Sequence, residues 1–185
     1  MRLPVTPIAV YLIVLGWASL PFVPAEPMLV GAGSYAATGA VHLLVVVAAA
    51  AGGALASDLA KYAIGRAAGP AVLRRLSTRE SGARAVEWIE TRARRIGPAA
   101  IVPSYFVPFG VVAATLLCGA LRMRLGPVAA ASTAGAVLWS SMFVLLGYAG
   151  GAVTHNPVTG ALLALPVALA LGVVLSRVAT ARTSG

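Results

Sequence analysis

The chain has few charged residues and few of the side chains that carry chemistry in enzymes. Only 10% of its 185 residues are charged and 59% are apolar, whereas an ordinary soluble domain has roughly 25% charged residues. There is one cysteine, Cys118, and the two histidines, His42 and His155, have no companions at ligand spacing. These absences exclude an internal disulfide and a multi-cysteine metal site, and we expect neither a metal nor a cofactor.

Motifs of hydrolases, nucleotide-binding proteins and redox enzymes are missing as well. The chain has no Gly-x-Ser-x-Gly, no P-loop, no His-Glu-x-x-His and no pair of cysteines. These are the spacings that arrange nucleophiles, phosphate loops and metal ligands for such reactions. Ser57 and Asp58 are adjacent, but no histidine is near them in the sequence. The sequence therefore predicts a protein that is not an enzyme.

Acidic side chains are scarcer than basic ones. The chain has 14 basic and 5 acidic residues, a net charge of +9, and Lys61 is its only lysine. The arginines flank apolar segments, which is typical of membrane topology and of contact with anionic lipids rather than with nucleic acid. We expect one integral membrane domain over residues 1–185. Its expected partners are anionic or phosphorylated membrane lipids, with a second copy or another membrane protein as a further partner.

The apolar runs predict an all-α membrane fold. A transmembrane helix needs about 20 apolar residues, and about four runs are long enough, namely 5–23, 41–64, 127–147 and 157–176. The runs 28–40 and 97–121 are short or broken by proline, and we expect them to be re-entrant helical hairpins, which enter the membrane and return. The predicted breaks are Pro24, Pro27, Pro103 and Pro108.

The arginine clusters predict the topology. They lie within 66–95, just after 121 and just after 176, and the positive-inside rule places such clusters in the cytoplasm. All of them lie on one side if 97–121 dips and returns, which puts both termini in the cytoplasm. The abundance of Ala, Val and Gly, and of Arg over Lys, indicates a high-GC bacterium, and we expect this membrane protein in the bacterial cytoplasmic (inner) membrane. An alternative for the N-terminus is a signal peptide cleaved near Val23-Pro24-Ala25.

The segment 78–96 predicts an amphipathic cytoplasmic helix. Ser77-Thr78-Arg79-Glu80 has the spacing of a capping box, and Glu90 and Arg94 are placed for an i,i+4 ion pair. Apolar residues then recur at spacings of three and four, at Val86, Ile89, Ala93 and Ile96. Such a helix lies on a membrane surface. A solvated connecting helix is the alternative.

Two parts of the chain repeat the same pattern. Gly53, Gly65 and Gly69 recur 82 residues later as Gly135, Gly147 and Gly151, and Phe-Val-Pro occurs at 22–24 and again at 106–108. A duplicated unit within an apolar chain is typical of membrane transporters. With the topology above, half-repeats over 5–77 and 97–151 run in opposite directions and form an inverted repeat. Chance or helix packing alone is the alternative origin.

Two carboxylates lie in apolar surroundings, Glu26 between Pro24 and Pro27, and Asp58 in the run 41–64. An ionisable side chain in a membrane is a functional candidate because its burial is costly, and burial favours the protonated carboxyl group. We therefore expect proton exchange at Glu26 and Asp58. The alternatives are an exposed interfacial loop for Glu26 and a structural Asp58–Lys61 pair.

These motifs together resemble the DedA family, also called VTT or SNARE-associated membrane proteins. The first half carries Pro24-Ala25-Glu26 and Gly53-x4-Asp58-x3-Tyr62-x2-Gly65-Arg66-x2-Gly69. The second half carries Gly97, Pro108, Gly119-x3-Met123, Gly135-x3-Trp139 and Gly147-Tyr148-x2-Gly151. The resemblance covers roughly residues 22 to 151.

The resemblance implies facing re-entrant hairpins and lipid translocation. Bacterial members are linked to the return of polyprenyl phosphate, with proton coupling, and eukaryotic relatives act as scramblases. Glu26 and Asp58 match the family's essential acidic residues. The chain departs from the family at Tyr105 and Val111, where arginines commonly stand that are candidates to bind the lipid phosphate. The phosphate-binding candidates that remain are Arg66, Arg92, Arg95, Arg122 and Tyr62.

The missing arginine pair leaves other hypotheses open. The chain handles a different lipid, or it is a scaffold that does not transport and binds another membrane protein through its small-residue helix faces. A proton-coupled drug or ion exporter is a third hypothesis.

Overall fold

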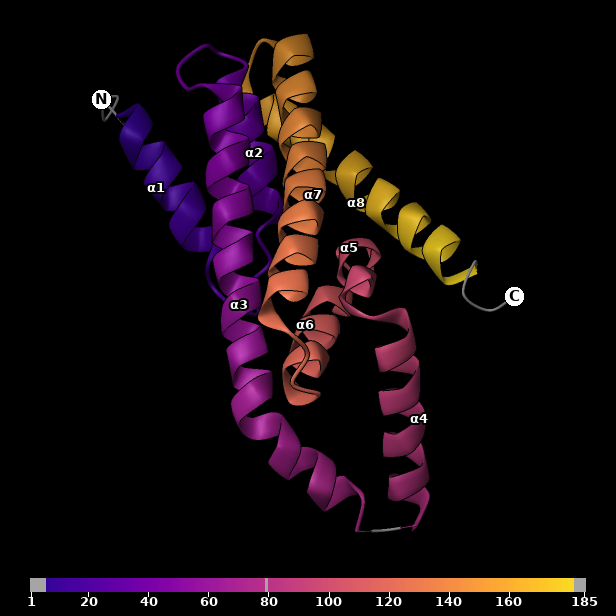
Figure 1. Ribbon diagram of the computed structural model, residues 1–185. Coiled ribbons are helices and arrows are strands. Elements are labelled where there is room, and N and C mark those ends of the chain that lie inside the picture. Colours follow the sequence, from indigo (N-terminus) through magenta and orange to yellow (C-terminus); the bar gives the residue numbers. More distant parts are fainter. Residues whose placement is uncertain (1–5, 79, 182–185) are drawn as a thin grey trace. The chain divides into compact units, whose positions relative to one another are not determined.

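The computed structural model describes residues 6–78 and 80–181, and every regular element in that part of the chain is helical (Figure 1). The elements, in order, are α1 (Pro7–Ala18), α2 (Glu26–Ala36), α3 (Leu43–Leu76), α4 (Glu80–Ile96), the 3-10 turn η1 (Pro98–Ala100), α5 (Ile101–Ser104), α6 (Gly110–Ala120), α7 (Leu125–Thr154) and α8 (Pro157–Ala181). The expectation of an all-α chain is confirmed for these residues.

In the part of the chain that the structure describes, two helices are long and apolar enough to cross a membrane, Leu43–Arg75 of α3 and Leu125–Thr154 of α7. The predicted span 157–176 falls partly on α8 side chains outside the described ones. At 1.5 Å per residue the two long helices are about 50 and 45 Å long, well over the roughly 30 Å of a hydrocarbon core. Both exceed the predicted spans 41–64 and 127–147. α3 continues through Arg66 and Pro70 to Leu76, because tertiary packing around Gly65 and Gly69 supports turns that the arginines weaken in the sequence pattern.

The first helix is shorter than the predicted span 5–23. α1 ends at Ala18, where the Ser19 side chain donates a hydrogen bond of 2.7 Å to the Leu15 carbonyl. Prolines follow, and Phe22 has a φ of +68° that no α-helix allows. With 12 residues α1 is about 18 Å long, so the expectation of a first full span was wrong in its length.

The chain forms two compact units. The first holds α1, α2, the start of α3 to Ser57, the part of α7 from Ala136, and α8. In it, α2 packs against α8 and α1 (Figure 1). A Cβ at Gly33 of α2 would collide with the Val144 carbonyl of α7, and one at Gly147 with the Val30 carbonyl of α2. The two backbones therefore touch.

The second unit covers Asp58–Gly135. Its core is formed by Tyr62, Ile101, Cys118 and Val128, with Val111 and Met123 packed around them. A Cβ at Gly119 of α6 would collide with the Tyr62 carbonyl of α3, and one at Gly65 of α3 with the Leu116 carbonyl of α6. The cluster and the close backbone contact bind α5, α6 and the two ends of the long helices into one body.

A similar close crossing of a short and a long helix occurs within each of the two units. α2 and α6 both have 11 residues and begin 84 positions apart. The α3 glycines at 65 and 69 touch residues 116 and 120 of α6, and the α7 glycines at 147 and 151 touch residues 30 and 34 of α2. In each unit the short helix therefore comes from one half of the sequence and the long helix from the other.

α4 follows α3 after a short turn. Ser77 donates its hydroxyl to the Arg74 carbonyl over 2.9 Å, which closes the end of α3. Arg79 and the side chain of Glu80 lie outside the described residues, so the capping box stays a prediction. On α4 the Trp88 side chain is 62% exposed and the Arg92 guanidinium lies 5.5 Å from its ring centroid.

Candidate functional site

A buried charged cluster lies in the second unit. The Lys61 ammonium is 2.9 Å from Asp58 Oδ1, and the Tyr105 hydroxyl donates a hydrogen bond of 2.7 Å to Asp58 Oδ2. Asp58 is 1% exposed and Lys61 is 5% exposed. Both carboxylate oxygens thus have a partner, one cationic and one neutral. The Asp58–Lys61 pair therefore buries two charged side chains in a stretch of α3 that is otherwise largely apolar.

Local structure explains how the cluster forms. Asp58 and Lys61 are three residues apart on α3, so they share one face of the helix. Tyr105 reaches them because α5 ends at Ser104 and the chain turns before α6 begins at Gly110. A Cβ at Gly135 would touch the Tyr105 ring. Because Gly135 has no Cβ, α7 can approach the phenol ring of Tyr105 closely. This close approach keeps the Tyr105 hydroxyl against Asp58.

Tyr62 forms a second polar link one residue further along α3. Its hydroxyl donates to the Met123 carbonyl over 2.6 Å and accepts a hydrogen bond of 3.3 Å from Arg66 Nη1. Tyr62 is also part of the apolar core of the second unit. It fastens the turn between α6 and α7 to α3, so its observed contacts are with the protein itself.

Among the described residues, the first unit has no buried ion pair at the positions equivalent to Asp58 and Lys61. The offset of 82 residues that relates the long helices takes Asp58 to Ser140 and Lys61 to Phe143, both of which are buried. The Ser140 hydroxyl bonds only locally, to the Val137 carbonyl at 3.3 Å. The two units share a helix crossing but not its polar content, so the buried ion pair belongs to one half alone.

Glu26 lies in the first unit, as the first residue of α2. Its side chain is partly exposed, and no ion pair or hydrogen bond is recorded for its carboxylate among the residues described. A carboxylate in the first turn is favoured by the helix dipole. A cavity of about 660 Å³ lies between α1 and α2, lined largely by apolar side chains that include Trp17, Met28 and Tyr35, and Glu26 is not part of this lining.

The predicted phosphate-binding arginines do not come together. Arg66 bonds Tyr62, Arg92 stacks on Trp88, and Arg95 is exposed on α4. Arg122 lies in the turn after α6 and lines a separate cavity. The sequence indicates Lys61 only as a structural partner of Asp58. It indicates Tyr105 only as a position where family members commonly have arginine. The 44-residue separation of Lys61 and Tyr105 gives no local signal of a shared site.

The positions where the family commonly has arginines have different surroundings. Tyr105 contacts Asp58, whereas Val111 packs on the apolar cluster around Tyr62 and Ile101. At the first position a neutral donor meets the carboxylate, and the cation comes from Lys61. At the second position, the Val111 side chain has no polar atom that could replace the arginine.

Comparison with known proteins places the chain in a family. The model of the VTT domain matches residues 23–149, which is more than half of the chain. No curated protein and no solved structure gives a significant match. The matched region contains Glu26, the buried cluster, and the contacts of Gly65, Gly69 and Gly147, while Gly151 lies just beyond it.

Proposed function

Since this chain belongs to the VTT-domain family, the domain of the DedA family, we propose that it is a lipid transporter. It moves a polyprenyl phosphate or a phospholipid across a bacterial cytoplasmic membrane, with proton coupling. The observation that carries this proposal is the buried Asp58–Lys61 pair with its Tyr105 donor, on a helix long enough to cross a membrane.

A buried ion pair is poor evidence of a stabilising role. The desolvation of two charges often exceeds their mutual attraction, and apolar residues of similar size are frequently as good. In an apolar segment such a pair is expected to have a function. Because the pair is buried and has a third partner, Tyr105, we propose that it belongs to the transport site.

The pair couples a proton to an anion. Protonation of Asp58 would neutralise the carboxylate and leave the Lys61 ammonium without its counter-ion. A phosphate group could then replace the carboxylate as that counter-ion. Proton binding and phosphate binding therefore strengthen each other, and linkage makes the effect equal in both directions. In this proposal Lys61 takes the part that the family resemblance implies for an arginine.

The first unit has an apolar cavity of its own. It lies between α1 and α2 and has a volume of about 660 Å³, within the range of sites for small ligands. We propose that α1 with α2, and α5 with α6, are the re-entrant hairpins, because the helices in each pair are too short to span. Because α3 then crosses the membrane once before α4, the start of α1 and α4 lie on opposite faces, and we place α4 on the cytoplasmic face. The predicted cytoplasmic N-terminus requires α1 to cross the membrane instead.

The scaffold hypothesis needs free glycine faces. Gly135 and Gly147, two of the small residues on these helices, are used inside the chain, against the Tyr105 ring and the Val30 carbonyl. This use argues against partner binding through those two residues and favours transport.

Headgroup translocation in proteoliposomes tests the proposal. We would compare labelled polyprenyl phosphate with labelled phospholipid, with and without a pH gradient, for the wild type, Glu26→Gln, Asp58→Asn, Lys61→Met and the double variant Asp58→Asn/Lys61→Met. The double variant is the matched control for folding, because it removes both charges and leaves neither unpaired. We expect it to fold and to lose transport.

The outcomes separate the hypotheses. Gradient-dependent movement of one lipid indicates a carrier-lipid transporter, and equal movement of all lipids indicates a scramblase. Normal transport by a folded double variant would exclude the charged pair from the mechanism. If well-folded wild-type protein moves no lipid, the scaffold hypothesis would be favoured over transport.

A further inference from the structure

We propose that a second cavity, formed by the end of α3, by α4 and by the turn after α6, is a binding site for a phosphomonoester group. Three arginines line it, Arg74, Arg94 and Arg122. All of its lining residues belong to the second unit. The site is separate from the Asp58 cluster and does not depend on transport.

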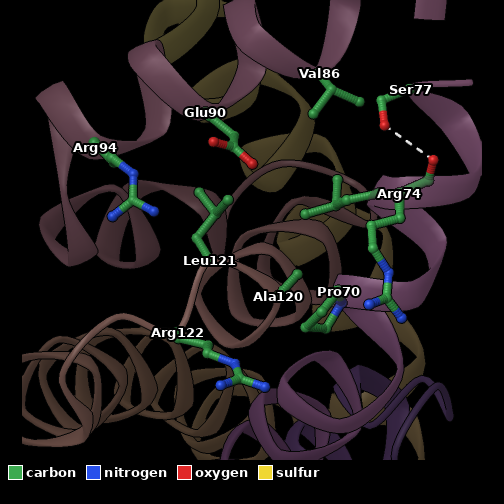
Figure 2. Close-up of a pocket in the computed structure, with 10 residues that line it drawn as sticks. Pro70, Arg74, Ser77, Val86, Glu90, Arg94, Ala120, Leu121 and Arg122 are labelled. Atoms are coloured by element: carbon green, nitrogen blue, oxygen red, sulfur yellow. Dashed lines mark hydrogen bonds between the residues drawn. The ribbon is translucent and has the colours of Figure 1, made fainter. Parts of the chain in front are cut away.

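The charges around this cavity are unbalanced. Each arginine comes from a different element, and Figure 2 shows them around the cavity with Leu121 and Ala120 between them. Glu90 is the acidic residue in the lining. No ion pair is recorded for it or for the three arginines in the described part of the chain, so the predicted Glu90–Arg94 pair is not formed. The lining thus contains three guanidinium groups and one carboxylate, an excess of positive charge that favours an anionic ligand.

Arg122 occupies a backbone position that normally selects glycine. Its φ is +53°. Its N–H donates to Gly119 O over 2.9 Å and the next N–H, that of Met123, donates to Cys118 O over 3.0 Å, which is the Schellman pattern at a helix C-terminus. Glycine is the usual residue there because a Cβ is disfavoured at positive φ. The backbone gains nothing from arginine here, so the side chain has a role outside the turn.

The turn that carries Arg122 is also held in place. The Tyr62 hydroxyl on α3 donates to the Met123 carbonyl over 2.6 Å, and α3 and α6 touch at Gly69 and Ala120. Arg74 lies further along the same α3 helix. Arg74 and Arg122 are therefore presented from two elements that are locked together, and such preorganisation favours binding.

The shape and lining of the cavity define the ligand further. Guanidinium groups match phosphate oxygens in a bidentate manner, and several of them favour a dianionic monoester over a diester. Its volume of about 330 Å³ is at the lower end for ligand sites, enough for a headgroup. Pro70, Leu73 and Leu121 supply apolar contacts for the first carbons beyond the phosphate.

The position of α4 favours a lipid as the source of that phosphate. Val86, Glu90 and Arg94 line the cavity at spacings of four residues, while Trp88 is exposed with Arg92 stacked on it. An exposed tryptophan with arginines is typical of a helix at a membrane surface. A lipid phosphate can therefore enter the cavity while its chains stay in the bilayer.

Calorimetric titration of the full-length protein in phosphatidylcholine nanodiscs tests the site. The probes are short-chain phosphatidic acid, short-chain phosphatidylglycerol and soluble glycerol 3-phosphate. The key variant is Arg122→Gly, which removes the guanidinium and suits the backbone, so we expect folding to be kept. The matched control is Arg124→Gln, which removes one positive charge from a residue outside the cavity.

We expect phosphatidic acid to bind more tightly than phosphatidylglycerol. Arg122→Gly should weaken it by about ten-fold or more, as for the loss of a charge-assisted hydrogen bond, and Arg124→Gln by no more than about two-fold. Equal affinity for glycerol 3-phosphate would support the phosphate site and assign it to a soluble ester. Equal losses in both variants, or equal binding of both lipids, would overturn the proposal, since general attraction to anionic lipid then explains the binding.

Discussion

Tyr105 donates a hydrogen bond of 2.7 Å to Asp58, across 47 residues of sequence. The contact fills the place where the DedA family commonly has an arginine, and the positive charge is supplied instead by Lys61 on the other carboxylate oxygen. The Asp58 carboxylate thus has a neutral donor on one oxygen and a cation on the other. Four predictions follow from this cluster and from the contacts around it.

Tyr105→Phe should lower stability without unfolding the protein. It removes a hydrogen bond to a charged acceptor, which is worth about 1.5–3 kcal/mol, while the Lys61 ion pair remains. Thermal unfolding in detergent measures the effect. A Tyr105→Phe protein as stable as the wild type would show that the hydrogen bond contributes nothing.

Moving the cation should preserve the cluster. In Tyr105→Arg/Lys61→Met, the guanidinium would pair with Asp58 and the methionine would fill the space of the lysine stem. We expect a folded protein, in contrast to Lys61→Met alone, which leaves an unpaired buried carboxylate at a cost of about 3–5 kcal/mol. The yield of monodisperse protein compares the two. If the double variant is the less stable one, the position of the cation is not interchangeable.

Alanine at the crossing glycines should prevent folding. A Cβ at Gly65 would meet the Leu116 carbonyl, and one at Gly147 the Val30 carbonyl, so each pair of helices would have to separate. We expect little folded protein from either variant. Gly52→Ala and Gly126→Ala are controls on the same two helices, because a Cβ there meets nothing within 4 Å, and they should fold normally. Loss of folding in the controls as well would point to a general effect of the substitution.

Tyr62→Phe should loosen the turn after α6. The Met123 carbonyl loses its donor and Arg66 loses its acceptor, with an expected cost of about 1–3 kcal/mol. Tyr148→Phe is the matched control, since Tyr148 is 38% exposed and surface changes stay within about 0.5 kcal/mol. The thermal unfolding temperatures of the Tyr62→Phe and Tyr148→Phe proteins, each compared with that of the wild type, measure the difference in stability. If the site proposed around Arg122 exists, Tyr62→Phe should also weaken phosphatidic acid binding.

The sequence predicted the helical class and the family. Apolar run length, prolines and glycine spacing are local properties. They predicted about four membrane spans, of which α3 and α7 are long and apolar enough to cross, a separate helix over 78–96 and the resemblance that the VTT-domain match confirms. Of the predicted breaks, Pro24 and Pro108 lie between helices, whereas Pro27 and Pro103 lie inside α2 and α5. The sequence also singled out Asp58 and Lys61, because an i,i+3 pair is visible on one helix. The end of α1 was predicted five residues too late, because Ser19 ends the helix inside a run that is apolar throughout.

The tertiary structure decided what those residues contact. Tyr105 and Asp58, the Tyr62 link to Met123, and the cavity shared by Arg74, Arg94 and Arg122 join residues tens of positions apart. Their proximity depends on where backbones can touch, which the glycines at 65, 119 and 135 permit by lacking a Cβ. A sequence pattern records the glycines but not which carbonyl each of them meets. The chain alone therefore determined which residues carry charge in an apolar setting, and packing determined which of them share a site.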